Sequence, residues 1–124
     1  MTQEQKDLLL KDLCARLPYG VKIAVDDEVE ILEGISALDT AAEYDSLRSS
    51  DIEDIKPYLF PLSNMTEEQK VIYGDFCYAI IHSLAWDMQA SLNELFDWLN
   101  KNHFDYRGLI EKGLAIDATG LNIY

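Results

Sequence analysis

Basic residues are scarce in this chain. Of its 124 residues, 10 are Lys or Arg and 23 are Asp or Glu, which gives a formal net charge of −13 at pH 7. Proteins that grip the phosphates of a nucleic acid do so with clustered Lys and Arg, and no such cluster stands in this sequence. We therefore expect no direct binding of nucleic acid.

Cysteine, proline and glycine are also sparse, with two, three and six residues. The 48% share of hydrophobic residues is that of an ordinary globular domain rather than a disordered or fibrous chain. No apolar run approaches the roughly 18 residues that cross a membrane, and no signal-peptide pattern is present. We expect one cytoplasmic domain over residues 1–124, without membrane contact, in which Cys14 and Cys77 are reduced core thiols.

The chain opens with the pattern of a capped helix. Thr2 and Gln5 stand at capping-box spacing, and apolar residues at helical spacing continue as far as Leu17. Pro18 should end this helix, because the residue before a proline is disfavoured in the helical conformation.

Strands should follow. Apolar and polar residues alternate over 21–25 and again over 29–32, which predicts a two-stranded antiparallel hairpin. The pattern weakens over 36–50, where a third strand is only weakly specified. Pro57 and Pro61 favour an edge strand or a crossing loop, because proline cannot donate to a central ladder.

Acidic residues concentrate between Asp26 and Asp54. This segment holds eleven acids and one base, Arg48, so its net charge of −10 supplies most of the total. It lacks the ligand spacing of a calcium-binding loop. Two interpretations stay open: a solvated surface, or a contact for a basic protein through its last acids, Asp51, Glu53 and Asp54.

A long helix is predicted to begin after a second capping box, formed by Thr66 and Gln69. Continued to Asn100 it would be about 50 Å long, too long for a compact domain with a radius of gyration of about 14 Å. Ser91 and Glu94 repeat the capping pattern, so we expect a break near residue 90. The apolar residues before this break form one broad buried face: Ile72, Tyr73, Phe76, Cys77, Ile80, Ile81, Leu84, Ala85 and Met88.

Local signals are densest from Asp97 to Ala115. The helix should end between Asn100 and His103, after which Asp105 can cap a short helix over 106–112 that Gly113 stops. The aromatic residues of this stretch are expected to join the two halves of the domain: Trp98, Phe104 and Tyr106.

Signatures of catalysis and of cofactor binding are missing, including nucleotide-binding glycine motifs, a nucleophile elbow and metal-ligand spacings. His82 is expected to be partly buried, and His103 to sit in its positive form at a helix C-terminus. We therefore predict no catalytic, metal or cofactor-binding residue, no cofactor, and a protein that is not an enzyme. Possible partner-binding residues are of the types that dominate interface hot spots: Trp86, Trp98, Tyr106 and Arg107. For Trp98, a core position is the alternative.

Together these patterns predict an α+β fold. An N-terminal helix and a small antiparallel sheet of two to four strands should occupy residues 1–62, and a helical half residues 63–124.

Three blocks carry a family resemblance: LLLKDLCARLPYGVK over 8–22, KPYLFPLSNMTEEQ over 56–69, and DWLNKNHFDYRGLIEKGLAIDA over 97–118. Together they resemble a widespread family of small uncharacterised proteins of gut bacteria, often encoded in prophage-like regions. The resemblance covers about half of the chain and implies no activity or site residue.

The leading hypothesis is a non-enzymatic accessory or interaction protein of a phage or other mobile element, with a protein partner. The alternative is an acidic decoy that occupies a nucleic-acid-binding protein through Asp51, Glu53 and Asp54. A small hydrolase is the third hypothesis, and it requires His82 or His103 beside a nucleophile or a carboxylate.

Overall fold

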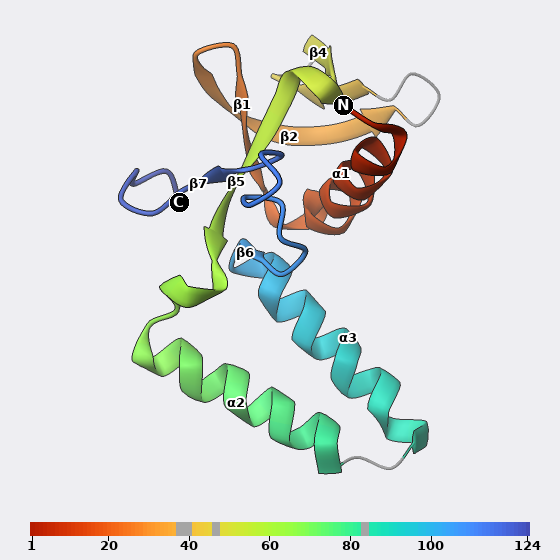
Figure 1. The fold of residues 1–124 in the computed structure, drawn as a ribbon, viewed down its shortest axis with the longest axis vertical. Coiled ribbons are helices and arrows are strands. Elements are labelled where there is room, and N and C mark those ends of the chain that lie inside the picture. Colours follow the sequence, from red (N-terminus) through yellow and green to blue (C-terminus); the bar gives the residue numbers. More distant parts are fainter. Residues whose placement is uncertain (37–40, 46–47, 83–84) are drawn as a thin grey trace.

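The protein consists of a mixed α/β part, here called the head, and a helical hairpin that projects from it (Figure 1). The computed structural model describes residues 1–36, 41–45, 48–82 and 85–124, except for the side chains of residues 85 and 86. Its elements in chain order are α1 (Gln3–Arg16), the 3-10 turn η1 (Leu17–Tyr19), β1 (Lys22–Val25), β2 (Glu28–Ser36), β3 (Ala41–Tyr44), β4 (Arg48–Asp51), η2 (Ile52–Asp54), β5 (Ile55–Pro61), η3 (Leu62–Asn64), α2 (Glu67–His82), α3 (Ala85–Lys101), β6 (Phe104–Asp105) and β7 (Ile116–Asp117).

Helix α1 begins as its sequence predicts. The backbone N–H of Gln5 donates to the Thr2 hydroxyl at 3.1 Å, and the Thr2 N–H donates to the Gln5 side chain at 3.0 Å, which completes the capping box. The helix ends at Arg16 and passes into the turn that holds Pro18. The predicted capped helix before Pro18 is therefore confirmed.

The sheet is larger than predicted and is mixed. Its strand order is β4-β3-β2-β1-β5-β6, and β7 also pairs with β5. The predicted hairpin is formed by β1 and β2, which are antiparallel, whereas β6 and β7 run parallel to β5. The α+β class is confirmed, but a purely antiparallel sheet of two to four strands was wrong.

Strand β5 lies in the middle of the sheet, so its predicted edge position was wrong. Pro57 pairs with Ile23 at the end of the ladder with β1, and the ladder with β7 starts one residue later, at Tyr58. Pro61 is the last residue of the strand. Both prolines therefore stand where a ladder ends, and the missing N–H groups interrupt little pairing.

The core of the head lies between α1 and the sheet. Leu9 and Leu13 of α1 are fully buried against a cluster from β1, β2, β3 and β5 and from the loop after β6. The members contributed by β1, β5 and that loop include Ile23, Leu59 and Leu109, all completely covered. Burial of side chains from both ends of the chain makes the head one cooperative unit.

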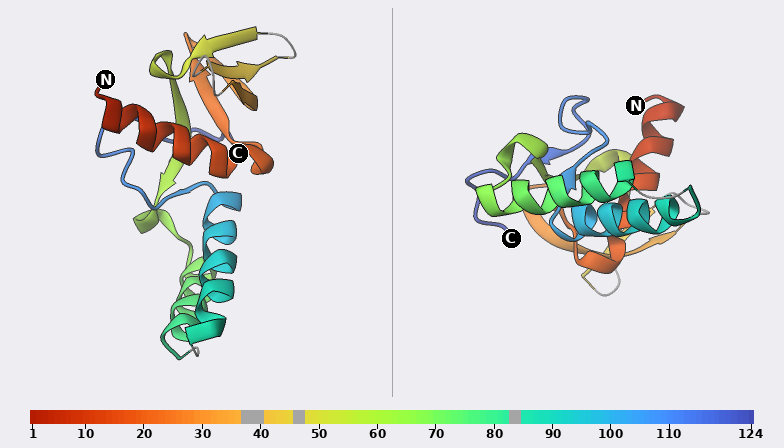
Figure 2. Two further views of the ribbon diagram at one scale, coloured as in Figure 1. Left: turned by 90° about the vertical axis from the view of Figure 1, so that its right-hand side faces the viewer. Right: turned by 90° about the horizontal axis from the view of Figure 1, so that it is seen from below.

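The hairpin consists of α2 and α3, helices of 16 and 17 residues that extend away from the head (Figure 2). A break near Ser91 was wrong, since Ser91 and Glu94 lie inside α3. A Ser-x-x-Glu pattern is also compatible with the interior of a helix, so it does not fix a boundary unless tertiary packing requires one. Helix α2 already ends at His82 and α3 begins at Ala85, and the two helices are nearly equal in length.

Turns replace the short helix expected over 106–112. The carboxylate of Asp105 accepts hydrogen bonds from the N–H groups of Leu109 and Ile110, both at 2.9 Å. Gly108 has a φ of +73°, which a right-handed helix does not allow. Gly113 has a φ of +74°, but no helix precedes it, so its predicted role as a helix stop was wrong as well.

The two ends of the hairpin meet at the sheet. Phe60 of β5 pairs with Phe104 of β6, and the Phe60 N–H donates to the carbonyl oxygen of His103 at 2.8 Å. The chain therefore leaves the head after β5 and re-enters it directly beside the point of exit.

Candidate interaction surface

Apolar side chains surround α2, and one line of them packs against α3. Tyr73, Phe76 and Ile80 contact a cluster that includes Leu95 and Leu99 of α3. The ring of Phe76 also lies 5.9 Å, between centroids, from the ring of Trp98. This line is the inner face of the hairpin and accounts for the pairing of its two helices.

A second apolar line runs along the opposite side of α2. We call it the α2 stripe: Val71, Gly74, Tyr78 and Ile81. Its members are spaced by three, four and three residues, the spacing that places side chains on one helical seam. Val71, Tyr78 and Ile81 are 64%, 66% and 75% exposed. None of the residues of α2, all of which are described, is buried. The stripe has therefore no cover within the described chain.

Gly74 stands in the middle of the stripe. A methyl group added there would meet no described atom within 4 Å, so packing within the chain does not require glycine. Glycine in a helix interior costs about 1 kcal/mol relative to alanine. Glycine is nevertheless favourable here if another backbone or a large side chain packs closely against the helix at Gly74, because a Cβ atom would prevent that contact.

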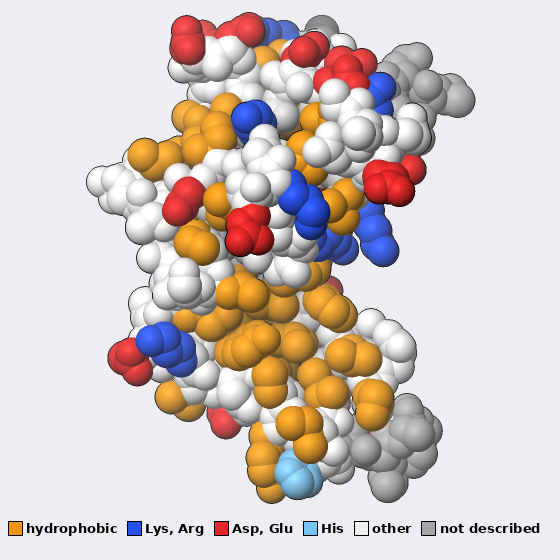
Figure 3. Space-filling model, viewed as in Figure 1, with side chains coloured by type: hydrophobic (Ala, Val, Ile, Leu, Met, Phe, Trp, Pro, Cys, Tyr) orange, Lys and Arg blue, Asp and Glu red, His pale blue; other side chains and the backbone are white. Residues whose placement is uncertain are grey.

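The exposed apolar surface is large for a protein of this size. The three large side chains of the stripe expose roughly 400 Å², which is within the range of the largest, often functional, patch on a monomer. Figure 3 shows hydrophobic side chains gathered over the hairpin and its junction with the head, whereas acidic ones lie mainly over the head. In the described part of the chain, no helix is long and apolar enough to cross a membrane.

The sequence prediction of one broad buried face on this helix was wrong. Ile81 was assigned to that face, but it is the most exposed residue of the stripe. Leu84 and the side chain of Ala85, assigned there too, lie outside the described residues, as does the side chain of Trp86. The 3-4-3 spacing of Val71, Gly74, Tyr78 and Ile81 was the signal that could have separated the two faces.

Trp98 is mainly a structural residue. Its ring lies 5.7 Å from that of Phe104, between centroids, and belongs to the cluster at the base of the hairpin. Phe104 is 2% exposed, and Tyr106 packs at the edge of the same cluster. The expectation that these aromatics join the two halves agrees with their positions at the junction of hairpin and head.

Tyr106 and Arg107 belong to a polar network between α1 and the end of α3. Arg107 Nη1 donates to Asp12 Oδ1 at 2.8 Å and to the Tyr106 hydroxyl at 2.9 Å. The Tyr106 hydroxyl donates in turn to Asn100 at 2.8 Å. Both residues also line a groove of about 540 Å³ beside α1, so each keeps an accessible part.

A fully buried ion pair lies at the centre of this network. Asp12 and Arg16 both have side chains with 0% exposure, and Arg16 Nε donates to Asp12 Oδ2 at 2.8 Å. Arg16 Nη2 donates to the carbonyl oxygen of Phe104 at 2.6 Å, while Nη1 has no hydrogen-bond partner among the described atoms. Asp12 is therefore the counter-ion of two arginines, Arg16 and Arg107.

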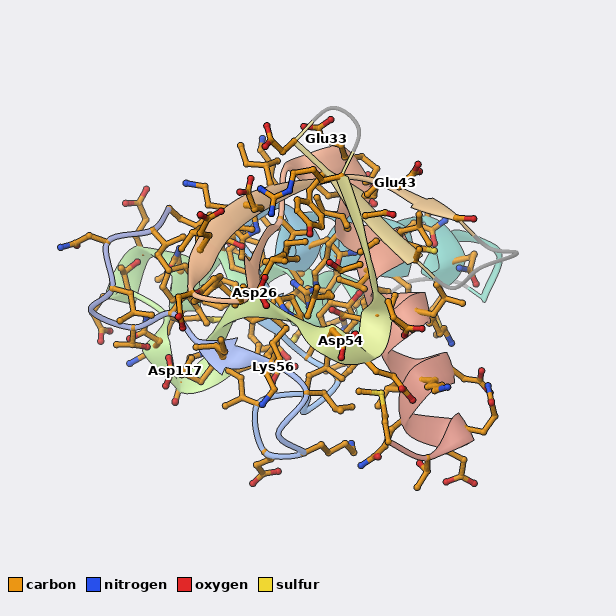
Figure 4. All side chains as sticks on the ribbon, turned by 90° about the horizontal axis from the view of Figure 1, so that it is seen from above. Asp26, Glu33, Glu43, Asp54, Lys56 and Asp117 are labelled. Atoms are coloured by element: carbon orange, nitrogen blue, oxygen red, sulfur yellow. The ribbon has the colours of Figure 1, made fainter. Side chains whose placement is uncertain are left out.

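The proposed acidic contact residues lie in the head, at η2. Asp51 accepts a hydrogen bond from the Glu53 N–H at 3.0 Å and so caps this turn, and Glu53 pairs with Lys6 at 2.9 Å. Asp54 lines a hollow of about 470 Å³ with Asp26. Figure 4 shows that Glu33 and Glu43 lie on the other side of the head from Asp54, so the acids are spread rather than gathered on one face.

Neither histidine has the environment expected from the sequence. His82 is exposed, not partly buried, and its ring contacts Tyr78 at 4.1 Å between centroids. His103 stacks on Tyr124, with centroids 3.7 Å apart. Burial, together with the charges of Arg16 and Lys22, lowers the pKa of His103 to about 4. The positive form predicted for His103 was therefore wrong, because the ring is neutral at pH 7.

Acid is expected to destabilise the protein through His103. The folded-state pKa of about 4 lies below the ordinary value of 6.5, so the unfolded chain binds the proton first as the pH falls. The stabilisation is complete above pH 6.5 and is lost on the way down to pH 4. Because the ring is partly accessible, we expect a loss of about 1–2 kcal/mol in the free energy of unfolding, measured by urea denaturation across this range.

A His103→Asn variant is the control for this prediction. Asparagine tolerates the φ of +62° at this position and does not titrate in this range. The variant should lose less stability than the wild type between pH 6.5 and pH 4. Identical pH profiles for the two proteins would show that His103 is not the group responsible.

The described residues contain no group of three or more His, Cys, Asp and Glu side chains that could hold a metal ion. Cys14 and Cys77 are both free thiols. Cys14 is exposed and Cys77 is half-buried, so their predicted core positions were wrong. An exposed thiol at Cys14 reflects its place on the outer face of α1, opposite Leu9 and Leu13.

Comparison of the chain with protein families, with curated proteins and with solved structures finds no match. Its function is therefore argued from its own surfaces, of which the α2 stripe is the most distinctive.

Proposed function

We propose that this protein is a non-enzymatic interaction protein, an accessory of a phage or other mobile element, that binds its partner through the α2 stripe. The observation that carries the proposal is the complete lack of buried residues in α2, all of which is described, despite its apolar sequence. A helix that is apolar all round is normally buried on all sides. The resemblance to prophage-associated proteins supports the mobile-element context.

A hydrophobic contact is better supported than an acidic decoy. Of the three acids proposed for the decoy, Asp51 caps a turn and Glu53 is paired with Lys6. Arg48 is likewise surrounded by Glu28, Glu30 and Asp45, at 3.6–3.9 Å. Several acids of the segment therefore form hydrogen bonds or ion pairs within the head. The large side chains of the α2 stripe are instead exposed.

The environments of the histidines give a hydrolase little support. His103 stacks on Tyr124 and feels the charges of Arg16 and Lys22. It lines a pocket with Thr66, whose hydroxyl accepts the Gln69 N–H that caps α2. The ring against His82 is that of Tyr78. Cationic neighbours oppose the protonation that a general base must undergo.

Site-specific photo-crosslinking in the native cell tests the proposal. A photoreactive phenylalanine at position 78 should crosslink to a protein, because Tyr78 projects from the stripe. The matched control is the same probe at Ile31, which is 52% exposed on β2 of the head. We expect a crosslinked product from position 78 that is not lost in high salt, and none from position 31.

The opposite pattern would support the decoy. Crosslinks from position 31 alone, lost in high salt or in an Asp51→Asn, Glu53→Gln, Asp54→Asn variant, would indicate an electrostatic contact of the head. No crosslink from position 78 would reject the α2 stripe as an interaction surface.

A further inference from the structure

We infer that the occupant of the α2 stripe is a second copy of this chain, whose α2 lies antiparallel to the first. This pairing rests on the proposed function, because it uses the same surface and names its partner. It joins two hairpins through α2, so that the four helices form a row in which each α2 packs against its own α3 on one face and against the partner's α2 on the other.

The α2 stripe is complementary to itself under a two-fold rotation. Val71 and Ile81 each lie five residues from position 76, and Gly74 and Tyr78 each lie two residues from it. A two-fold axis at position 76 therefore places Val71 opposite the partner's Ile81, and Gly74 opposite the partner's Tyr78. In an isologous contact, a residue of one copy meets a second residue of the partner, and that second residue of the first copy meets the first residue of the partner. The pairs Val71–Ile81 and Gly74–Tyr78 follow this rule.

The opposed pair at the centre matches in shape. Tyr78 is the largest side chain of the stripe, and its ring is exposed. Gly74 leaves open space above the helix, so it can receive the ring of the partner's Tyr78. The ring contact with His82 on the following turn holds Tyr78 in place. This pairing gives a use to a glycine that the isolated chain does not need.

The area of the contact fits a weak dimer. Each copy contributes roughly 400 Å² from the large side chains of the stripe, and flanking residues add to this. The stripes of two copies give roughly 800 Å², below the lower limit of about 1,200 Å² for stable interfaces, so the flanking residues must supply the rest and the dimer should be weak. We therefore expect a dissociation constant in the micromolar range, about 1–100 μM.

Charge favours the antiparallel arrangement over the parallel one. The eleven acids between Asp26 and Asp54 belong to the part of the chain that forms the head, which joins the hairpin at the start of α2. Antiparallel helices place the two heads at opposite ends, whereas parallel helices place them side by side. Asp75, beside the stripe, faces the partner's Asp75 near the two-fold axis, so salt should strengthen the dimer.

Sedimentation equilibrium of the full chain over a range from about 1 to 300 μM tests the pairing. The wild type should show a monomer–dimer equilibrium that tightens with salt. Tyr78→Glu should be a monomer throughout, and Asp75→Asn should dimerise several-fold more tightly. Ile31→Glu, at an exposed apolar site in the head, should dimerise like the wild type.

Gly74→Ala separates dimerisation from folding. Alanine fills the space needed by the partner's Tyr78, so the dissociation constant should rise about tenfold. The same change favours the helix, so the thermal midpoint of the monomer should rise. A variant that gains stability and loses association cannot be explained by misfolding.

Crosslinking through Cys77 fixes the orientation. Cys77 lies one residue from position 76, on one flank of the stripe, so an antiparallel pair brings both thiols to the same side of the contact. In a Cys14→Ser background, a short bismaleimide should link two chains, and the additional change Cys77→Ser should abolish the product. A dimer without this product would contradict the antiparallel arrangement.

A wild type that stays monomeric over the whole range would overturn the pairing. In that case a cellular crosslink from position 78 to a different protein would leave the proposed function standing, while the lack of any crosslink would reject both. Sedimentation of the purified chain thus tests the self-pairing, whereas crosslinking in the cell tests the stripe as an interaction surface.

Discussion

An Asp12→Ala variant is expected to lose about 3–5 kcal/mol of unfolding free energy, one of the two largest effects expected for a single substitution in this protein. The substitution leaves Arg16, with 0% side-chain exposure, as a buried charge without a counter-ion. It also removes the carboxylate that pairs with Arg107, so the ion pair between α1 and the segment after β6 is lost. Urea denaturation followed by circular dichroism measures the loss.

Two further variants keep this prediction testable if Asp12→Ala does not fold. Asp12→Asn retains the size of the side chain and an acceptor oxygen, so its loss should be smaller. Asp12→Leu combined with Arg16→Met replaces the ion pair by apolar groups and should recover much of the stability. A loss below about 1 kcal/mol for Asp12→Ala would show that water or backbone groups already compensate Arg16.

A Phe104→Ala variant is expected to lose about 3–5 kcal/mol, because the substitution empties a ring-sized space at the junction of hairpin and head. Phe104 is 2% exposed, and its ring packs on Trp98. Chemical denaturation gives the stability, and hydrogen exchange should show faster exchange in the last turns of α3 than in the wild type.

Phe96→Ala is the matched control. Phe96 lies on α3, close to the same junction, but is 41% exposed, with its ring 5.2 Å from that of Tyr106 between centroids. Its removal should cost about 1 kcal/mol or less, with little change in exchange at the junction. Equal losses for the two variants would contradict the central place given to Phe104.

Local rules predicted the parts of the fold that short stretches decide. The capping box at Thr2 and the β1–β2 hairpin each depend on residues a few positions apart. Partners distant in sequence decide the central position of β5. Its neighbours β6 and β7 are two residues long, which is too short to carry a periodic signal.

Local sequence rules were equally unable to predict the candidate interaction surface, because its exposure depends on contacts between distant residues. The apolar residues of α2 were visible in the sequence, but periodicity does not tell which of two apolar lines α3 covers. The ion pair is similar: Asp12 and Arg16 stand four residues apart, as on many exposed helices. Their burial is decided by Phe104 and Arg107, about ninety residues further along the chain.

The meeting of β5 and β6 has a consequence for how this protein can change. Since Phe60 and Phe104 are direct neighbours in the sheet, the hairpin is an excursion that starts and finishes at one place. Insertions, deletions or exchange of the segment between these two residues leave the strand register of the head untouched. The head can therefore keep its fold while helical hairpins of different sequence are inserted between these two residues, and each such hairpin could bind a different partner.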